Sequence, residues 1–515
     1  MSGLKARSIN IARDEKEDVV STIKTDRIIF RLFLVALAII PLIIGAKARL
    51  FISPAISGVG ITSTNYQLDF FTFFKFSLLL LVMIITLLLF LYKVFFLNYK
   101  IKWSPPLYAI AIFIFALSLS VVFAEYKTIA MWGIYNRHDG ALTFIAYAVL
   151  MFIALNITYP KKALNYLVYA TYPFVWVNVI ISLLNLYGIN ILENSVVHKL
   201  FTLFLMDEMS IGEGSILTGT LNQWNYMSGY SAVMAILFLT LAVFHGSIKS
   251  KIVNLLTAIA AFSTILASIS TSGFVSLLLM LVLLLILILM KKNMKKSLVW
   301  LGSFILLATI STTVLAKHNP QVWTESFGFF TKKNPFVQVE ETFKELGRID
   351  NKVSAADPTL ELPVLPERTM SGGSGRVYIW ENMITLIKEK PITGYGLDTL
   401  IYHFPQNDIN KRDGFMYETV LIDKPHNLFI GLLYGTGFLG LLSFLSIVVI
   451  YTFKLGKYVL KDQQSPKIWA FTLGWGAFLI QALLNDSVIG ATIVPLLATA
   501  IIYAIANTQD GNEIS

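Results

Sequence analysis

The sequence predicts an all-α fold, a polytopic transmembrane helix bundle of about twelve spans with one long extracytoplasmic loop that bears an amphipathic helix. Two observations support this prediction. Hydrophobic residues make up 56% of the 515 positions and charged residues only 14%, with a mean hydropathy of +0.69. Apolar stretches of spanning length also recur from one end of the chain to the other. Soluble domains are much more polar, so most of this chain has lipid as its solvent.

Each predicted span is an apolar run long enough to cross about 30 Å of hydrocarbon as a helix. The first 27 residues are polar and of mixed charge, and the run that follows lacks a small-residue cleavage site, so we expect a first span rather than a cleaved signal. The twelve runs cover residues 28–46, 70–97, 106–124, 141–157, 164–188, 226–244, 251–269, 272–290, 297–316, 427–453, 467–484 and 488–506.

Basic residues alternate from loop to loop, and this alternation predicts the orientation in the cell (plasma or inner) membrane. The N-terminal segment and every second loop are rich in lysine, so we assign them and both termini to the cytoplasm. The predicted organisation is a cytoplasmic segment (1–27), nine spans (28–316), an extracytoplasmic loop (317–426), three spans (427–506) and a cytoplasmic tail (507–515).

The loop 317–426 is too long and too polar to be a simple connector. Within it, Ser374 can cap a helix whose apolar side chains, from Ile379 to Ile387, recur at helical spacing. Pro391 and the glycines that follow it end this helix. We expect the helix to lie along the membrane surface or across the mouth of the bundle.

Four polar clusters interrupt the apolar pattern, and the predicted orientation brings all four to the outer side. We therefore expect them to form one site. They are Trp132–Gly140, Gly219–Tyr226, Ser374–Trp380 with the Gly394–Gly396 turn, and Lys424–Asn427.

These clusters contain side chains suited to transfer chemistry. Arg137 and Arg376 suit a phosphate or pyrophosphate, because guanidinium stays charged and offers a planar fork of donors; contacts with lipid headgroups are the alternative. His426 could accept a proton from a sugar hydroxyl, or could be only an interfacial hydrogen-bonding residue. Asn222 and Asn225 could bind a sugar or cap a helix.

Other classes of chemistry have no support in the sequence. Cysteine is absent, and the other histidines have no partners at metal-ligand spacing, so we predict no metal site and no cofactor. No phosphate-binding or dinucleotide motif occurs, which disfavours nucleotide donors. The basic residues behind the net charge of +10 lie in short loops between spans, where membrane topology explains them. We therefore predict no nucleic-acid partner.

The ordered set of clusters resembles the O-antigen ligase and O-antigen polymerase family of bacterial membrane proteins. The similarity runs loosely from about Trp132 to Asp486. It is carried by Arg137 with Gly140, Asn222 with Asn225, Arg376 with Trp380, Pro391–Gly396, Pro425–Leu428 and Gly435–Gly440. One departure is that members often have an arginine directly after a serine at the turn that here reads Ser270-Thr271-Ser272.

The resemblance implies transfer of a glycan from a polyprenyl diphosphate carrier to a glycan or glycolipid acceptor on the outer membrane face, without metal or nucleotide. It implies that Arg376 holds the diphosphate and that His426 activates the acceptor hydroxyl. Further contacts to donor or substrate would come from the other residues of the clusters, namely Arg137, Asn222, Asn225, Trp380 and Asn427.

Three alternatives are open at this stage. A transporter or flippase of lipid-linked glycans would also need many spans and cationic side chains, although such proteins usually place charges near the bilayer midplane and often have internal symmetry. A glycan-to-protein transferase would differ only in its acceptor. Ligase and polymerase activities likewise differ in acceptor and not in visible chemistry.

Overall fold

The computed structural model describes residues 15–50, 66–205, 211, 216–221, 223–291, 294–331, 334–336, 375–412, 420–460 and 465–512. It is a helix bundle, as predicted. A helix lies at each of the twelve predicted spans: α1 (Glu15–Ile39), α2 (Phe73–Phe96), α3 (Pro105–Phe123), α5 (Ala141–Ala154), α6 (Ala163–Leu186), α8 (Trp224–Phe244), α9 (Ile248–Ala267), α10 (Thr271–Leu289), α11 (Met294–His318), α16 (Leu428–Leu460), α17 (Pro466–Leu484) and α18 (Ile489–Asn512).

Ten of these helices are long and apolar enough to cross a membrane by length and composition, among the described residues. The chain is thus a multi-pass membrane protein. The shorter α5 has 14 residues, and the first half of α1 is polar. The first helix also begins before the predicted run 28–46, within the polar N-terminal segment. It ends before that run does, because Pro41 disfavours helical backbone in the residue before it.

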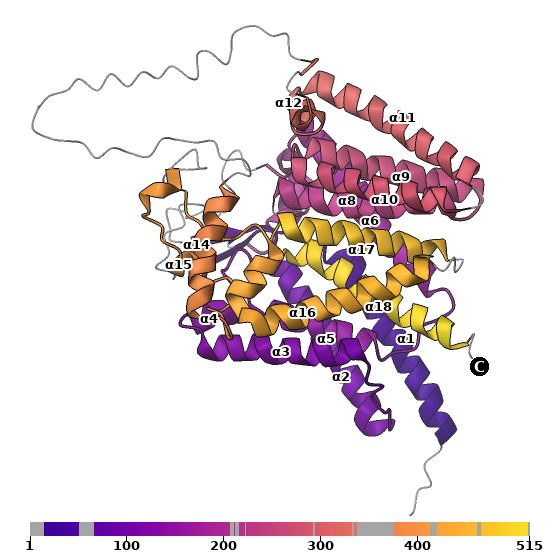
Figure 1. Cartoon of the computed structure of the whole chain (residues 1–515), viewed down its shortest axis with the longest axis vertical. Coiled ribbons are helices and arrows are strands. Elements are labelled where there is room, and N and C mark those ends of the chain that lie inside the picture. The colour runs from indigo at the N-terminus through magenta and orange to yellow at the C-terminus, as the bar shows by residue number, and fades with distance from the viewer. Residues whose placement is uncertain are drawn as a thin grey trace, which may run out of the picture.

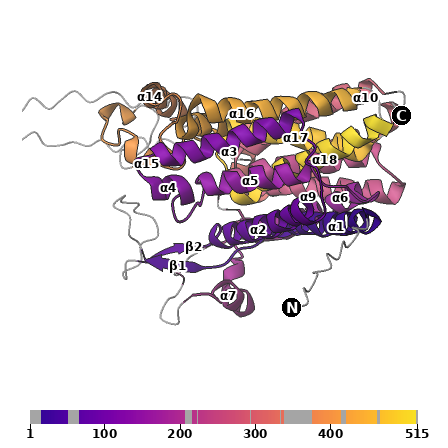
Figure 2. The ribbon, with the colours of Figure 1, turned by 90° about the horizontal axis from the view of Figure 1, so that it is seen from below.

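Shorter elements connect the spans. They are an antiparallel hairpin of β1 (Lys47–Leu50) and β2 (Tyr66–Asp69), and the short helices α4 (Lys127–Trp132), η1 (Ile191–Glu193), α7 (Ser195–Phe201), α12 (Gln321–Thr324), η2 (Phe327–Phe329), α14 (Arg376–Glu389), α15 (Leu400–His403) and η3 (Ile409–Arg412). The hairpin was not predicted from the sequence. Helices α4, α14 and α15 lie together at one end of the bundle, whereas α1 begins and α18 ends at the opposite end (Figures 1 and 2).

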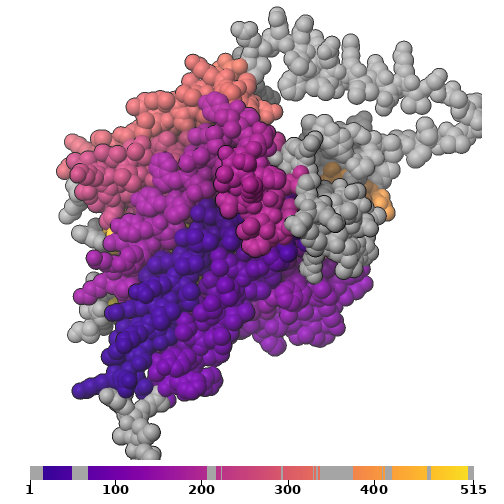
Figure 3. Space-filling model, turned by 180° about the vertical axis from the view of Figure 1, so that it is seen from behind, coloured from indigo at the N-terminus to yellow at the C-terminus, as the bar shows by residue number. Residues whose placement is uncertain are grey.

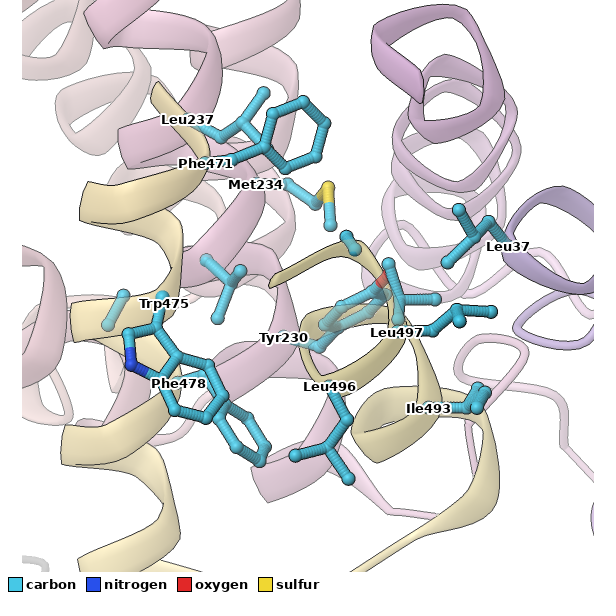
Figure 4. Close-up of a cluster of buried hydrophobic side chains, with 14 of the residues drawn as sticks. Leu37, Tyr230, Met234, Leu237, Phe471, Trp475, Phe478, Ile493, Leu496 and Leu497 are labelled. Atoms are coloured by element: carbon cyan, nitrogen blue, oxygen red, sulfur yellow. The ribbon is translucent and has the colours of Figure 1, made fainter. Parts of the chain in front are cut away.

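The centre of the bundle is α8, whose side chains are buried on every side from Tyr226 to Val243. A helix that is hydrophobic all round belongs in an interior. Figure 4 shows how its side chains meet those of α17, α18 and α1: Tyr230, Met234 and Leu237 with Phe471, Trp475, Phe478, Ile493, Leu496, Leu497 and Leu37. This packing fixes α8, α17 and α18 relative to one another.

Helices at the periphery of the bundle expose apolar side chains instead of burying them on every side. Helix α2 packs against α1 on the face seen in Figure 3 and exposes large apolar side chains such as Leu81, Leu88 and Phe95. These side chains suit contact with lipid tails. Inside the same pair of helices, Lys93 forms a buried ion pair with Asp26, and Asp26 also accepts a hydrogen bond from the backbone N–H of Thr158 at 2.9 Å. The pair therefore ties α1 and α2 to the end of α5.

Candidate active site

The segment 423–428, which leads into α16, is held by side chains and backbone groups from several distant parts of the chain. Nε1 of Trp380 donates to the carbonyl oxygen of Pro425 at 2.8 Å. The side-chain oxygen of Asn427 accepts the N–H groups of Phe429 and Ile430, and its amide donates to the carbonyl of Leu483 at 3.0 Å. Asn427 is therefore the cap of α16, and Trp380 orients the residue before His426.

His426 faces a buried carboxylate. Its Nδ1 lies 3.0 Å from Oδ2 of Asp486, in the turn between α17 and α18. The His426 side chain is 40% exposed and that of Asp486 only 5%. Burial alone would raise the pKa of Asp486, but the hydrogen bond with His426 and the charge of Lys424 bring it below its ordinary value. Asp486 is thus an ionised partner that can orient the imidazole.

The backbone at His426 has φ +53°, in the left-handed region. Histidine occurs there more often than most residues, although the conformation is uncommon for any side chain other than glycine. The hydrogen bonds of Pro425 and Asn427 on either side hold this conformation. The imidazole is therefore fixed from both its backbone and its side chain.

Arg376 reaches the same turn as His426. It is the first residue of α14, after Gly375, which is the N-cap with φ +77°; Ser374, the predicted cap, lies outside the described residues. Its Nη2 donates to the carbonyl oxygen of Leu484 at 3.1 Å. Burial lowers the pKa of Arg376 and nearby Asp486 opposes this shift, but guanidinium stays protonated at any physiological pH.

The turn after α14 docks onto a kink in α16. The N–H of Tyr395 donates to the carbonyl of Tyr434 at 2.9 Å, and that of Gly396 to the carbonyl of Gly435 at 3.0 Å. Gly394 has φ +66°, and a Cβ there would lie 2.5 Å from the carbonyl oxygen of Tyr434. Only glycine fits this close approach. The docked turn fixes α14, and hence Arg376 and Trp380, across the end of the bundle, as expected for the predicted loop helix.

Two ion-pair systems join the first polar cluster to the fourth. Nη1 of Arg137 lies 2.6 Å from Asp423, its Nη2 lies 3.3 Å from Asp398, and Nζ of Lys424 lies 3.2 Å from Asp139. Burial opposes the charges of Arg137 and Lys424, but the facing carboxylates raise the pKa of both above the ordinary values. Arg137 is therefore already neutralised by carboxylates.

The carboxyl group of Asp139 responds differently to its surroundings. Burial is the largest influence on it, and although Lys424 opposes the effect, the pKa of Asp139 rises to about 6. This group therefore changes its protonation in mildly acidic solution.

The asparagine cluster lies beside the turn that lacks the family arginine. Oγ of Ser270 donates to Oδ1 of Asn225 at 2.6 Å. Asn222 lies outside the described residues. Helix α8 begins at Trp224 with Gln223 as its cap, so Asn225 is not the helix cap.

A relay of hydrogen bonds connects this turn to α16. Gln481 donates to the carbonyl of Ser272 at 2.9 Å and accepts from the amide of Asn485 at 2.6 Å, and the carbonyl of Asn485 accepts the N–H of Leu428 at 3.1 Å. The second and fourth clusters are thus linked through the C-terminal end of α17.

Two cavities flank Asp486, and both Leu428 and Asp486 line each of them. The first, here named the Asp423 pocket, has a volume of about 420 Å³. It is lined by Asp139, Phe144, Leu397, Asp398, Leu400, Asp423, Lys424, Pro425, Asn427, Leu428, Gly431, Leu432, Tyr434, Asp486 and Ser487. The second, of about 370 Å³, lies between the first turns of α8 and α18 and the last turns of α17 and is mostly apolar.

The geometry is that of a concave site with a histidine–carboxylate pair and a nearby guanidinium. Residues 256–445 match the family model described as O-Antigen ligase. This region of the chain is therefore similar to the O-antigen ligase family. The matched range contains Arg376, Trp380 and His426. Comparison with curated proteins gave no match.

Other parts of the site lie outside the matched region. The fold brings Arg137, Asn225 and Asp486 to the site, although none of the three lies in the matched region. The sequence analysis assigned Asp486 no role in the site, although an aspartate in the short turn between two apolar spans is a usable signal. It also missed the carboxylates of Asp398 and Asp423, because nothing in their local sequence marks them as partners of Arg137.

Proposed function

We propose that the protein moves a glycan from a polyprenyl diphosphate carrier to a hydroxyl of a glycan or glycolipid acceptor at the extracytoplasmic face, in cell-surface polysaccharide biosynthesis. The match of residues 256–445 to the O-antigen ligase family model supports a membrane glycan transferase. The convergence of Arg376 and His426 on the turn 484–486 is the observation that carries the finer assignment.

The reaction follows from this arrangement. With the Nδ1–H of His426 donated to Asp486, the lone pair of Nε2 accepts the proton of the acceptor hydroxyl. The acceptor oxygen then forms a bond to the anomeric carbon of the donor, and the bond from that carbon to the diphosphate oxygen breaks. The bonding electrons leave with the diphosphate, whose developing charge the Arg376 guanidinium stabilises. Asp486 stabilises the imidazolium that forms on His426.

The assignments of single residues follow their contacts. Asn427 and Trp380 hold the segment around His426, and we assign them a positioning role beside any contact with substrate. Arg137, paired with Asp398 and Asp423, is less suited to the diphosphate than Arg376 is. Asn225 lies beside the outer end of α8, where it can contact the donor.

The experiment is a transfer assay with the purified protein in proteoliposomes. The donor is a polyprenyl diphosphate glycan, and candidate sugar, glycolipid and peptide acceptors are compared. We expect His426→Gln and Arg376→Ala to lose most transfer, while His403→Gln and Lys388→Ala, which change a histidine and an exposed lysine of the same loop, keep it. Transfer by both site variants at the wild-type rate would contradict the mechanism. Movement of lipid-linked glycan across vesicles without transfer would support a transporter instead.

A further inference from the structure

The Asp423 pocket borders the segment that carries His426. Pro425 and Asn427, the chain neighbours of His426, line the pocket, and so does Asp486, its hydrogen-bond partner. His426 itself is not among the lining residues, so a sugar bound there would lie beside the segment that holds the imidazole.

The charge of the pocket disfavours a phosphate. Four aspartates line it, and Lys424 is the one cationic side chain among its described lining residues. Asp423 is 45% exposed in its side chain, and Arg137 contacts only one edge of it. An anion that entered would meet an excess of negative charge. Arg376, the residue assigned to the diphosphate, does not line this pocket.

Two polar atoms at or behind the inner wall make no hydrogen bond of ordinary geometry among the described residues. They are Oδ1 of Asp139, which lines the pocket, and the hydroxyl of Tyr147, which lies behind the lining residues Asp139 and Ser487 and does not itself line the pocket. Buried polar atoms without partners are rare because they are costly, and a ligand hydroxyl could donate to the Asp139 carboxylate.

Apolar side chains form the rest of the lining, chiefly Phe144, Leu400, Leu432 and Tyr434. Mostly apolar walls with a few placed polar groups are typical of sites for small organic ligands. A pyranose ring has this dual character, with C–H faces and a rim of hydroxyls. The wall and the unpartnered atoms therefore both suit a sugar ring.

We propose that the Asp423 pocket binds the acceptor sugar, as a ring that carries hydroxyl groups and no negative charge. The assignment of this sugar as the acceptor rests on the proposed function. Neutral sugars and amino sugars fit the carboxylate-lined wall, whereas uronic acids and phosphorylated sugars are repelled by it.

Binding without any donor tests the proposal. The probes are three p-nitrophenyl glycosides that share one aglycone: the β-glucoside, the 2-amino-2-deoxy-β-glucoside and the β-glucuronide. Binding to the protein in nanodiscs is measured by saturation-transfer NMR titration. We expect the neutral and amino probes to bind at least about tenfold more tightly than the glucuronide. Equal or tighter binding of the glucuronide would overturn the proposal.

Two variants test which carboxylate causes the preference for probes without negative charge. Asp423→Asn removes the exposed charge, while Arg137 keeps its ion pair with Asp398. We expect the preference for the glucoside over the glucuronide to fall to about threefold. Glu381→Gln removes an exposed carboxylate of α14 outside the pocket and should leave the preference unchanged. An unchanged preference in Asp423→Asn, with thermal unfolding as in the wild type, would also overturn the proposal.

The two proposals fail separately. If the probe preference holds but no acceptor receives glycan, the proposed function fails while the sugar specificity of the pocket stands. If transfer is observed and the glucuronide binds as well as the glucoside, only the pocket assignment fails.

Discussion

Replacing Asp486 with asparagine tests whether the carboxylate acts through His426. The change keeps the size of the side chain and an oxygen that can accept the Nδ1–H, but it removes the negative charge 3.0 Å from the imidazole. A hydrogen bond to a charged partner is worth about 1.5–3 kcal/mol, against about 0.5–1.5 kcal/mol for a neutral one. The His426 side chain is 40% exposed, so solvent screens part of the difference.

We therefore expect the transition state, in which the imidazole is protonated, to lose about 1 kcal/mol, which corresponds to about a fivefold lower kcat. The assay is transfer in proteoliposomes at saturating donor and acceptor, well below the unfolding temperature. The KM for the donor should change little, because Arg376 is untouched.

Asp408→Asn is the matched control. Asp408 is also a carboxylate of the loop region, and it accepts a hydrogen bond from the Tyr378 hydroxyl at 2.7 Å, away from His426. It should lose stability without a comparable loss of kcat. If Asp486→Asn kept kcat within about threefold of the wild type while His426→Gln abolished transfer, the carboxylate would have only a structural role.

Three further outcomes follow from buried groups. Lys93→Met leaves Asp26 buried without its cation and should cost about 3–5 kcal/mol of stability, and the double variant with Asp26→Asn should recover part of this in thermal unfolding. Gly394→Ala forces a Cβ against a carbonyl at positive φ and should lower stability by about 1–3 kcal/mol, whereas Gly302→Ala, which meets nothing within 4 Å, should not. The pKa of Asp139 is about 6 in the folded protein, above the unfolded value of about 3.9. The folded state therefore binds a proton that the unfolded state lacks between these values, so the Tm of the wild type relative to Asp139→Asn should rise as the pH is lowered from about 7 to about 4.

The apolar runs predicted the spans because a length of about 20 apolar residues has few solutions in lipid other than a helix. A helix lies at every predicted run, and the loop helix after Gly375 begins at Arg376. The boundaries were less accurate. Helix α1 starts in the polar N-terminal segment, where lipid does not decide the conformation, and the β1–β2 hairpin gave no signal in so short a stretch.

The sequence predicted several residues of the site but not which side chains contact one another. His426 and Arg376 do meet at one turn, and their assignment to catalysis stays a prediction. The carboxylates that contact His426 and Arg137 could not be predicted, because Asp486 is 60 residues from His426 and Asp423 is 286 residues from Arg137. Long-range packing decides such pairs, and helical periodicity carries no information about them.

The position of Asp486 in the turn before the last helix has a consequence for biogenesis. Translation places His426 and Arg376 in the chain well before Asp486, and α17 and α18 must both be inserted before the turn between them can contact either residue. A chain that ends after α16 would carry the histidine and the arginine without the carboxylate that orients them. Under the proposed mechanism, the site is therefore complete only after the final helical hairpin has entered the membrane.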